Sequence, residues 1–283
     1  MTKANLKIIA LDLDGTLLDS QKRLSDVNRA ALAAAAERGA LVVPTTGRFF
    51  GMMPEAVRDL PFVRYAITIN GAQVYDRETD AAIVREEIPL EMAREVMALL
   101  DGYDVIYDCY RSNWGWMSEA FKAKAEDYAT DGHYLRMIRE FRRPVPELKA
   151  HLAATAADGD VQKIMLFTRR DAPEGATREI AAVVAARFPE LKVTNSTWNN
   201  LEINIRTAHK GRALARFAEH LGLSLANCIS FGDGANDLTM VEAAGVGVAM
   251  ANACPEVLAA ADYVTASNDE DGVAAALRHF CLC

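Results

Sequence analysis

The sequence predicts an α/β protein in which helices cover a parallel β-sheet and an α+β region is inserted into the chain. In residues 8–69, apolar strand-like runs alternate with helical segments, the order that is typical of parallel sheets. The same alternation resumes near Thr207, after a middle region with a different rhythm of elements. With 283 residues and 51% hydrophobic content, the chain is long enough for a large core and has the composition of a globular protein.

The first part of the chain begins with a buried strand. Its apolar run, Ile8–Leu11, ends where the carboxylates of Asp12 and Asp14 begin. A helix at 26–38 follows, because Ser25 is a natural N-cap, the alanines favour helix and the next residue is a glycine. The next expected elements are a strand at 40–43, a helix at about 49–60 and a strand at 65–69.

The middle region, 87–203, is long enough to be a domain inserted into a first domain made of 1–86 and 204–283. A turn-rich patch at 76–80 predicts a hairpin just before it. The stretch 139–146 is basic and contains two prolines, so we expect a loop there. The other expected elements of this region are helices at 90–101, 118–129, 147–157 and 174–187, and strands at 103–109, 161–168, 191–195 and 200–205.

The last part returns to alternating strands and helices. A helix at 210–220 precedes an apolar strand at 227–231, which leads into the polar run Gly232–Asp237. The elements expected after it are helices at about 238–244, 255–261 and 272–280, and strands at 246–250 and 263–265.

The charge balance limits the kinds of partner. The chain carries 31 basic and 39 acidic residues, a net charge of −8, which argues against nucleic acid or an acidic membrane surface as a partner. Residues 1–6 carry no apolar signal segment and no run reaches the length of a membrane span, so we expect a cytoplasmic protein. Five cysteines, without zinc-ligand spacing, agree with a reducing compartment. A monomer or a small homo-oligomer is expected.

Polar residues with chemical potential follow the predicted strands. Because ligands bind beyond the carboxyl ends of parallel strands, one sheet can bring such residues to a single site. The candidates are Asp12 and Asp14 after the first strand, Thr46 and Gly47 after the second, Lys210 at the start of the helix after the insertion, and Asp233, Asn236 and Asp237 after the strand at 227–231.

These residue types suit phosphoryl transfer. Carboxylates suit Mg²⁺, which proteins usually hold through a few of them together with waters and substrate phosphate. One aspartate can act as the nucleophile and form an aspartyl-phosphate, while another carboxylic acid protonates the leaving oxygen. Lysine, threonine, asparagine and backbone amides can hold the oxygens of the transferring phosphate.

Four motifs, in order, resemble those of the haloacid dehalogenase-like (HAD) hydrolase superfamily. They are DLDGTLL at 12–18, TGR at 46–48, KG at 210–211 and GDGANDLTM at 232–240. The wider pattern is similar to the Cof-type phosphatases of subfamily IIB, including NGA at 70–72 and GVAMANA at 247–253. The resemblance covers essentially the whole of the first domain.

The resemblance implies a Rossmann-like HAD core at 1–86 and 204–283 and an inserted αβ cap of the IIB type at 87–203, which would supply substrate specificity. It implies that Asp12 is the nucleophile and a Mg²⁺ ligand. Asp14 would be the general acid/base, and its backbone carbonyl would also bind Mg²⁺. Asp233 would be a further metal ligand, with Asp237 in the outer shell or positioning Lys210. The groups implied to hold the phosphate are the Leu13 amide, Thr46, Gly47, Lys210 and Asn236.

The activity implied is Mg²⁺-dependent hydrolysis of a small phosphate monoester. A sugar phosphate is favoured over a phosphorylated cofactor such as pyridoxal phosphate or flavin mononucleotide. One alternative is a phosphomutase of the same superfamily, which would make sugar bisphosphate and release little free phosphate. The other is a non-catalytic regulatory module that binds a phosphate ligand, although Asp14 would have no purpose in binding alone.

Several candidates also have simpler structural explanations. Thr46 and Asn236 could only cap helices, Lys210 could be a solvated helix residue, and an acid such as Asp237 is favourable in any first helical turn. Arg48 is expected to be structural or to pair with an acid. In the middle region, one group of residues could bind substrate, namely Tyr110, Arg111, Trp114 and Trp116, and a basic group could attract an anionic substrate, namely Arg139, Arg142 and Arg143. Aromatic residues there are more typical of packing, and basic runs are more typical of a solvated face.

Overall fold

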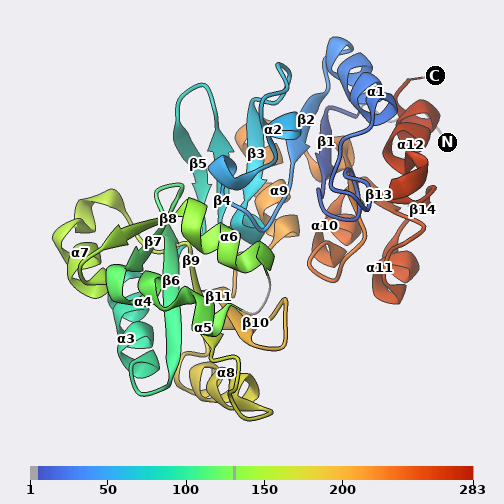
Figure 1. The fold of residues 1–283 in the computed structure, drawn as a ribbon. Helices are drawn as coiled ribbons and strands as arrows, with labels where there is room; N and C mark the ends of the chain where they lie inside the picture. The colour runs from blue at the N-terminus through green and yellow to red at the C-terminus, as the bar shows by residue number, and fades with distance from the viewer. Residues whose placement is uncertain (1–5, 130–131, 283) are drawn as a thin grey trace. The chain divides into compact units, whose positions relative to one another are not determined.

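In a computed structural model, which describes residues 6–129 and 132–282, the chain divides into two units (Figure 1). Unit 1 is Met1–Arg85 with Thr207–Cys283, and unit 2 is Glu86–Arg206. Residues 1–5, on which the expectation of no signal segment partly rests, lie outside the described residues. Among the described residues, no helix combines the length and the apolar composition that crossing a membrane requires.

The central sheet of unit 1 is parallel, as predicted. Its five strands lie in the order β14-β13-β12-β1-β2, with β1 between β12 and β2. In the register of the sheet, Leu11 pairs with both Phe231 and Pro44, so β1, β12 and β2 end at the same edge. The strands are β1 (Ile8–Leu11), β2 (Leu41–Pro44), β12 (Cys228–Gly232), β13 (Val246–Ala249) and β14 (Tyr263–Val264).

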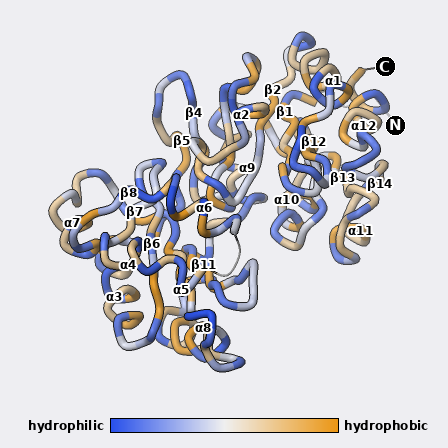
Figure 2. Tube along the Cα trace, viewed as in Figure 1, coloured by the Kyte–Doolittle hydropathy of each residue, from blue (hydrophilic) through white to orange (hydrophobic). Residues whose placement is uncertain are grey.

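Helices pack against both faces of this sheet because successive side chains of a strand point to opposite sides. Ile9 and Leu11 belong to the core that includes residues of α1 and α12, whereas Ile8 and Ala10 belong to the core formed with α9. Figure 2 shows hydrophobic and hydrophilic residues mixed along these helices, as expected for helices with one buried face. The helices are α1 (Asp26–Glu37), α9 (Lys210–His220), α10 (Leu238–Ala243), α11 (Pro255–Ala260) and α12 (Gly272–Phe280), with the 3₁₀ turns η4 (Leu225–Asn227) and η5 (Asn268–Glu270).

Two expectations for the first part of the chain are wrong. The helix predicted at 49–60 is a 3₁₀ turn, η1 (Phe50–Met52), and one short helix, α2 (Glu55–Arg58). Pro54 separates them, because a proline disfavours helical backbone in the residue before it, and Met53 is extended. The alternation of strands and helices also predicts that the strand at 65–69 belongs to the parallel sheet, but it does not.

Instead, β3 (Tyr65–Thr68) forms an antiparallel sheet with β4 (Gln73–Asp76) and β5 (Ala81–Arg85). The turn η2 (Ile69–Gly71) joins β3 to β4. An isolated parallel bridge between Thr45 and Ile67 connects this sheet to the residue that follows β2. The hairpin predicted around 76–80 is confirmed as β4 and β5.

Unit 2 contains a mixed six-stranded sheet in the order β10-β11-β9-β6-β7-β8 (Figure 1). Its neighbours pair antiparallel except β7 and β8, which are parallel. One hydrophobic cluster joins this sheet to α3, α7 and α8. The strands are β6 (Val105–Arg111), β7 (Trp114–Ser118), β8 (Arg142–Val145), β9 (Lys163–Thr168), β10 (Leu191–Thr194) and β11 (Asn200–Ile205), and the helices are α3 (Leu90–Leu100), α4 (Glu119–Ala123), α5 (Ala125–Tyr128), α6 (Gly132–Phe141), α7 (Leu148–Ala154) and α8 (Ala176–Arg187), with the 3₁₀ turn η3 (Ala156–Asp158).

The expectations for unit 2 fail between residues 114 and 146. The helix predicted at 118–129 is two short helices, α4 and α5, which share Lys124 as a non-helical boundary. The loop predicted at 139–146 contains the end of α6 and the strand β8. Pro144 is tolerated in β8 because this strand lies at the edge of its sheet. An edge strand has a neighbour on one side only, so the N–H that proline lacks is not needed for a bond to a second strand.

Candidate active site

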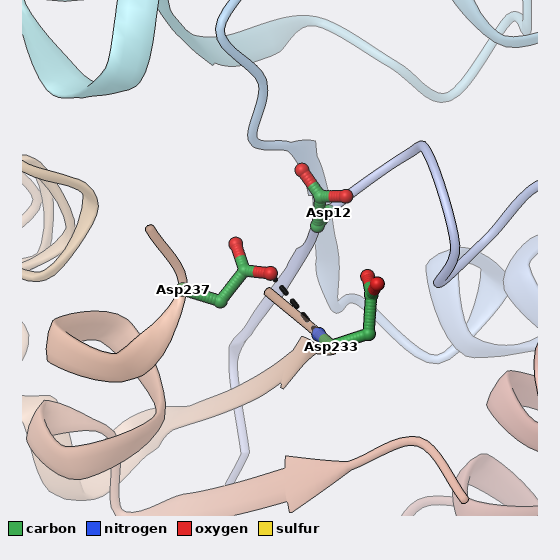
Figure 3. Close-up of side chains that lie close together, drawn as sticks. All are labelled: Asp12, Asp233 and Asp237. Atoms are coloured by element: carbon green, nitrogen blue, oxygen red, sulfur yellow. Dashed lines mark hydrogen bonds between the residues drawn. The ribbon is translucent and has the colours of Figure 1, made fainter. Parts of the chain in front are cut away.

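The aligned ends of β1 and β12 bring the predicted acidic residues of the first and fourth motifs together. Asp12 follows β1, and Asp233 and Asp237 follow β12. Each of the three offers a carboxylate oxygen, and these oxygens all lie within 4.8 Å of one another (Figure 3). Residues more than 200 positions apart in the sequence therefore meet at the edge of one sheet.

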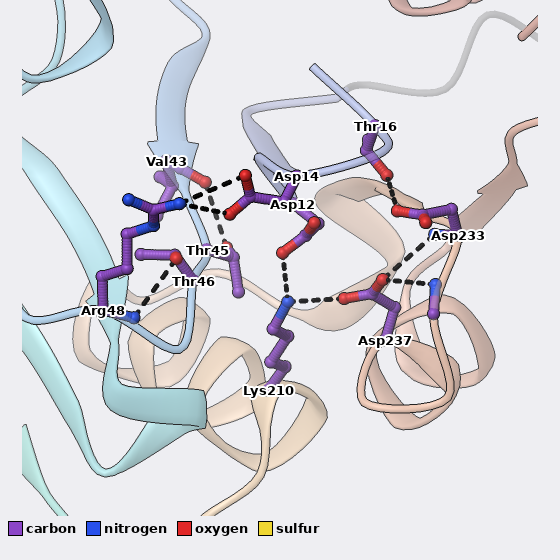
Figure 4. Close-up of polar contacts among 11 residues, drawn as sticks. Asp12, Asp14, Thr16, Val43, Thr45, Thr46, Arg48, Lys210, Asp233 and Asp237 are labelled. Atoms are coloured by element: carbon purple, nitrogen blue, oxygen red, sulfur yellow. Dashed lines mark hydrogen bonds and ion pairs between the residues drawn. The ribbon is translucent and has the colours of Figure 1, made fainter. Parts of the chain in front are cut away.

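Lys210 joins two of these acids. Its Nζ lies 2.5 Å from Oδ1 of Asp12 and 2.5 Å from Oδ1 of Asp237 (Figure 4). The lysine is fully buried at the start of α9, so the solvated-helix explanation for it is wrong. Burial opposes its charge, but the two carboxylates outweigh this effect and raise the pKa of Lys210 above its usual value. The ammonium therefore stays charged and is held by two fixed acceptors.

For the Asp12 carboxyl, in contrast, burial outweighs the nearby cation. It raises the pKa of this carboxyl to about 7, against the lowering effect of Lys210. Burial also raises the pKa of Asp233, although the Thr16 hydroxyl donates to its Oδ1 at 2.6 Å. The site thus gathers more negative charge than one lysine neutralises.

Asp237 shapes the loop after β12. Its Oδ2 accepts hydrogen bonds from the backbone N–H of Asp233 at 3.0 Å and of Gly234 at 2.9 Å, and its Oδ1 receives Lys210. Both oxygens are therefore engaged by protein donors. This arrangement fits a residue that positions Lys210 and the loop better than one that binds a metal directly.

The chemistry of the acidic cluster fits a divalent cation. Within the described residues, Oδ2 of Asp12 and Oδ2 of Asp233 carry no hydrogen bond, and both belong to the three-acid group. Hard oxygen ligands and surplus negative charge are the conditions under which proteins bind Mg²⁺. Asp12 and Asp233 are accordingly the residues that could hold it.

Asp14 lies in a different environment from the other acids. Its carboxylate receives Nη2 of Arg48 at 2.9 and 3.2 Å (Figure 4). It also receives Nζ of Lys22 at 2.9 Å. Burial acts to raise the pKa of Asp14, but the two cations together outweigh it and hold this pKa below its usual value. The two carboxylates of the first motif are therefore separated in partner and in charge state, and Arg48 pairs with an acid as expected.

The residues after β2 supply a hydroxyl and a bare backbone near the same edge. The Thr46 side chain is buried, and its Oγ1 accepts a hydrogen bond from the Arg48 N–H at 3.3 Å. A Cβ on Gly47 would lie only 2.9 Å from Oδ1 of Asn70. Ile69 and Asn70 both adopt left-handed backbone, with φ of 55° and 57°, a strained conformation for a β-branched residue.

Two predicted phosphate-binding residues make no side-chain contact that marks a role. Asn236 is exposed, and no hydrogen bond among the described residues links its side chain to the acidic cluster. The Leu13 side chain is buried in the hydrophobic core, so only its backbone is available. Two residues that contact the acids, Thr16 and Lys22, are not among the predicted site residues. Thr16 lies within the first motif, which is a signal for it, whereas no local pattern marks Lys22.

The comparisons with known proteins agree with this geometry. The profile of haloacid dehalogenase-like hydrolases matches residues 9–277. The chain belongs to this family. The HAD-like hydrolase is 30% identical to 5-amino-6-(5-phospho-D-ribitylamino)uracil phosphatase YcsE of Bacillus subtilis, over 98% of this chain and 97% of the relative. It is 28% identical to pyridoxal phosphate phosphatase YbhA of Escherichia coli, over 95% and 96% of the two chains.

Among solved structures, this HAD-like hydrolase is similar to the HAD subclass IIB sugar phosphatase BT4131. The TM-score is 0.76 with 24% identity, covering 98% of this chain and 100% of the other. The Cof-type, IIB fold predicted from the sequence is thereby confirmed. The chain is a phosphatase of this family, which disfavours the alternative of a non-catalytic module.

Proposed function

We propose that this phosphatase uses Mg²⁺ and hydrolyses small phosphate monoesters through an aspartyl-phosphate formed on Asp12. The observation that carries the proposal is the placement of Asp12, whose carboxylate touches Lys210 and forms a group with the half-buried Asp233 and the buried Asp237. A nucleophilic carboxylate needs a cationic environment that also neutralises the incoming phosphate. Lys210 supplies one such cation.

In the first step, a carboxylate oxygen of Asp12 bonds to phosphorus while the ester P–O bond breaks. The ion pairs with Arg48 and Lys22 keep Asp14 ionised in the free protein, so Asp14 has to take up a proton from solvent as the anionic substrate binds. It gives this proton to the leaving oxygen and returns to the carboxylate that Arg48 and Lys22 stabilise. In the second step, Asp14 takes a proton from water as the water oxygen bonds to phosphorus. The acyl-phosphate bond to Asp12 then breaks and releases inorganic phosphate.

The other residues bind and orient. Lys210, the Thr46 hydroxyl and the backbone at Leu13 and Gly47 would hold the oxygens of the transferring phosphate, with Asn236 as a further contact from its exposed position. Mg²⁺ held by Asp12, Asp233 and the Asp14 carbonyl would offset the negative charge that gathers between the phosphate and Asp12. Asp237 would keep Lys210 and the loop after β12 in place.

The substrates are small phosphorylated metabolites. The names of the two relatives specify a phosphoribitylamino-uracil and pyridoxal phosphate, which are both of this class. We include sugar phosphates, and we assign the choice among these esters to the inserted region 87–203. A panel of phosphorylated metabolites assayed for phosphate release would identify the preferred one.

The deciding experiment compares wild type with Asp12→Asn on p-nitrophenyl phosphate, with Mg²⁺ and with EDTA. We expect a loss of at least about a thousandfold in kcat for Asp12→Asn, and acid-stable labelling of wild type but not of the variant with ³²P-labelled substrate. Equal rates for the two proteins would refute the role of Asp12. Activity that survives EDTA would refute the metal, and transfer to a sugar phosphate without phosphate release would indicate a phosphomutase.

A further inference from the structure

The carboxylate of Asp14 is held from two directions by side chains that come from different parts of the chain. Arg48 contacts both oxygens from the segment after β2, and Lys22 contacts Oδ1 from the segment after β1. Arg48 lies within one of the four family motifs, but Lys22 lies outside all of them. The family motifs therefore do not account for Lys22 at this position.

Lys22 belongs to a short turn at residues 19–23 that is closed by its own hydrogen bonds. The Asp19 carboxylate accepts the N–H groups of Gln21 and Arg23, at 2.9 and 2.8 Å. The Lys22 N–H donates to the Asp19 carbonyl at 2.9 Å. Within this turn Lys22 has a φ of 62°, in the left-handed region that non-glycine residues rarely adopt.

The turn is also fixed to a distant segment of unit 1. The Ser20 N–H and hydroxyl both donate to the carboxylate of Asp269, at 2.8 and 2.5 Å. The Ser25 hydroxyl, just beyond the turn, donates to Asp271 at 2.5 Å. The turn that carries Lys22 is thus held in place by hydrogen bonds at Ser20, before the lysine, and at Ser25, after it.

The ion pair with Asp14 contributes little to the stability of the fold. The Lys22 side chain is 60% exposed, and exposed pairs of this kind stabilise proteins weakly. Stability therefore gives no reason for a lysine to occupy a strained backbone position at this point. Strained backbone that places a side chain against a reactive group indicates a functional role.

We infer that Lys22 is a positioning residue for Asp14, holding its carboxylate in one orientation opposite Arg48 while protons pass to the leaving oxygen and from water. The inference rests on the proposed function, because it requires Asp14 to be the general acid/base. Lys22 acts through Asp14 and need not touch the substrate.

The test uses two substrates of similar shape that differ in their need for an acid. p-Nitrophenolate leaves readily without a proton, whereas phenolate is a poorer leaving group and needs one. In Lys22→Met we expect kcat/KM for phenyl phosphate to fall about fivefold, the factor that corresponds to a strong exposed ion pair. Because Lys22 also helps to lower the pKa of Asp14, its loss makes Asp14 easier to protonate, and a purely electrostatic role would raise this kcat/KM instead. For p-nitrophenyl phosphate we expect a change of less than about twofold.

Three further proteins make the result specific. Lys22→Arg keeps a cation and should restore the wild-type ratio of the two kcat/KM values. Arg23→Gln removes the same unit of charge from the same turn, but its guanidinium bonds Asp19, so the ratio should stay at the wild-type value. In an Asp14→Asn background, Lys22→Met should have no additional effect on either substrate.

The outcomes separate this inference from the proposed function. If Asp14→Asn is selective for phenyl phosphate but Lys22→Met is not, only the role of Lys22 is refuted. An equal loss on both substrates in Lys22→Met would mean that the lysine attracts the substrate phosphate, which also overturns the inference. If Asp14→Asn leaves both substrates unaffected, the acid/base assignment of Asp14 fails, and the role of Lys22 fails with it.

Discussion

The carboxylate of Asp233 occupies the space beside Gly15. A Cβ built on Gly15 would lie 2.4 Å from Oδ2 of Asp233, far inside van der Waals contact. Gly15 also has a φ of +89°, which glycine adopts freely and other residues do not. A side chain at residue 15 would therefore displace one of the two carboxylates that we propose for the metal site.

We expect Gly15→Ala to remove most of the phosphatase activity. We also expect the remaining activity to need a higher concentration of Mg²⁺, because a displaced Asp233 would bind the metal more weakly. The measurements are kcat/KM with p-nitrophenyl phosphate over a range of Mg²⁺ concentrations and the melting temperature of the variant. The expected loss of activity is about a hundredfold or more, because misplacing a catalytic group by about 1 Å can cost that factor.

Gly39→Ala is the matched control. Gly39 has nearly the same backbone conformation, with a φ of +87°, but a Cβ on it would meet nothing within 4 Å. Both variants should lose about 1 kcal/mol of stability from backbone strain. Only Gly15→Ala should lose activity, and a comparable loss in Gly39→Ala would attribute the effect to strain rather than to Asp233.

The affinity for Mg²⁺ should depend on pH near neutrality. Burial raises the pKa of Asp12 to about 7 in the metal-free protein, so protons compete with the metal for this carboxylate below that pH. The carboxylate is largely ionised at pH 8 and only about one tenth ionised at pH 6. We expect the apparent Mg²⁺ affinity, measured by titration calorimetry, to be about tenfold weaker at pH 6, with proton release on binding. An affinity independent of pH would contradict the assignment.

Asp12→Asn gives the complementary measurement on stability. A carboxyl with a raised folded-state pKa makes the folded protein bind a proton that the unfolded chain releases, so its contribution favours folding less as the pH rises from about 4 to 7. At pH 8 in EDTA, removing this charge should raise the melting temperature by about 2 °C or more. A melting temperature below that of wild type would mean that the Asp12–Lys210 pair outweighs the cost of burial.

Much of unit 1 could be predicted because its signals are local. The apolar run Ile8–Leu11 predicts a buried strand, and the polar residues directly after each strand predict the edge at which Asp12, Lys210 and Asp233 meet. The separation of Asp14 from Asp12 could not be predicted in this way. It depends on Lys22 and Arg48, whose contacts with Asp14 span 8 and 34 positions of the chain.

Unit 2 was harder to predict because its polar residues are buried. Arg142 was expected on a solvated face, yet it is fully buried in β8. The Arg142 side chain passes over β7 at Gly115, where a Cβ built on the glycine would lie 2.5 Å from Cδ of Arg142. Beyond it, Nε of Arg142 pairs with Oδ2 of Asp108 at 2.8 Å. The burial of Arg142 depends on this pairing between strands, which no local pattern of charge reveals.

Asp237 should matter for stability as well as for activity. Asp237→Asn would remove one of the two negative charges that hold the buried Lys210 and would alter the acceptor of the Asp233 N–H. Lys210 keeps Asp12 as its other partner, so the expected cost is that of one charge-assisted hydrogen bond, about 1.5–3 kcal/mol. We expect a clear fall in melting temperature together with a loss of kcat larger than any change in KM.

Asp262→Asn is the control for this variant. Asp262 likewise accepts a backbone N–H in unit 1, from Gly247 at 2.8 Å, but no lysine of the described residues 6–129 and 132–282 pairs with it. It should lose about 1 kcal/mol or less and keep wild-type kinetics. Equal destabilisation by the two variants would show that the backbone bonds, rather than Lys210, account for the effect at residue 237.

The buried pair of Asp108 and Arg142 should dominate the stability of unit 2. Both side chains have no exposed surface, and Arg142 also donates to the Tyr110 hydroxyl at 2.7 Å. Arg142→Met would leave the Asp108 charge buried without its cation, at a cost of about 3–5 kcal/mol. All three tryptophans, Trp114, Trp116 and Trp198, lie in this unit, so their fluorescence during urea unfolding reports on it.

Changing both partners separates the cost of an unpaired charge from the value of the pair. Burial already raises the pKa of Asp108 in the intact protein, and removing Arg142 would raise it further. The folded variant would then bind a proton more tightly than the unfolded chain, so the deficit of Arg142→Met should be largest at pH 8 and shrink toward pH 5. Arg142→Met combined with Asp108→Leu should recover most of the loss at pH 8 and show no such pH dependence, because replacing both members of a buried pair is often nearly neutral. A double variant as unstable as Arg142→Met would mean that the packing around Gly115 and Tyr110, and not the unpaired carboxylate, sets the cost.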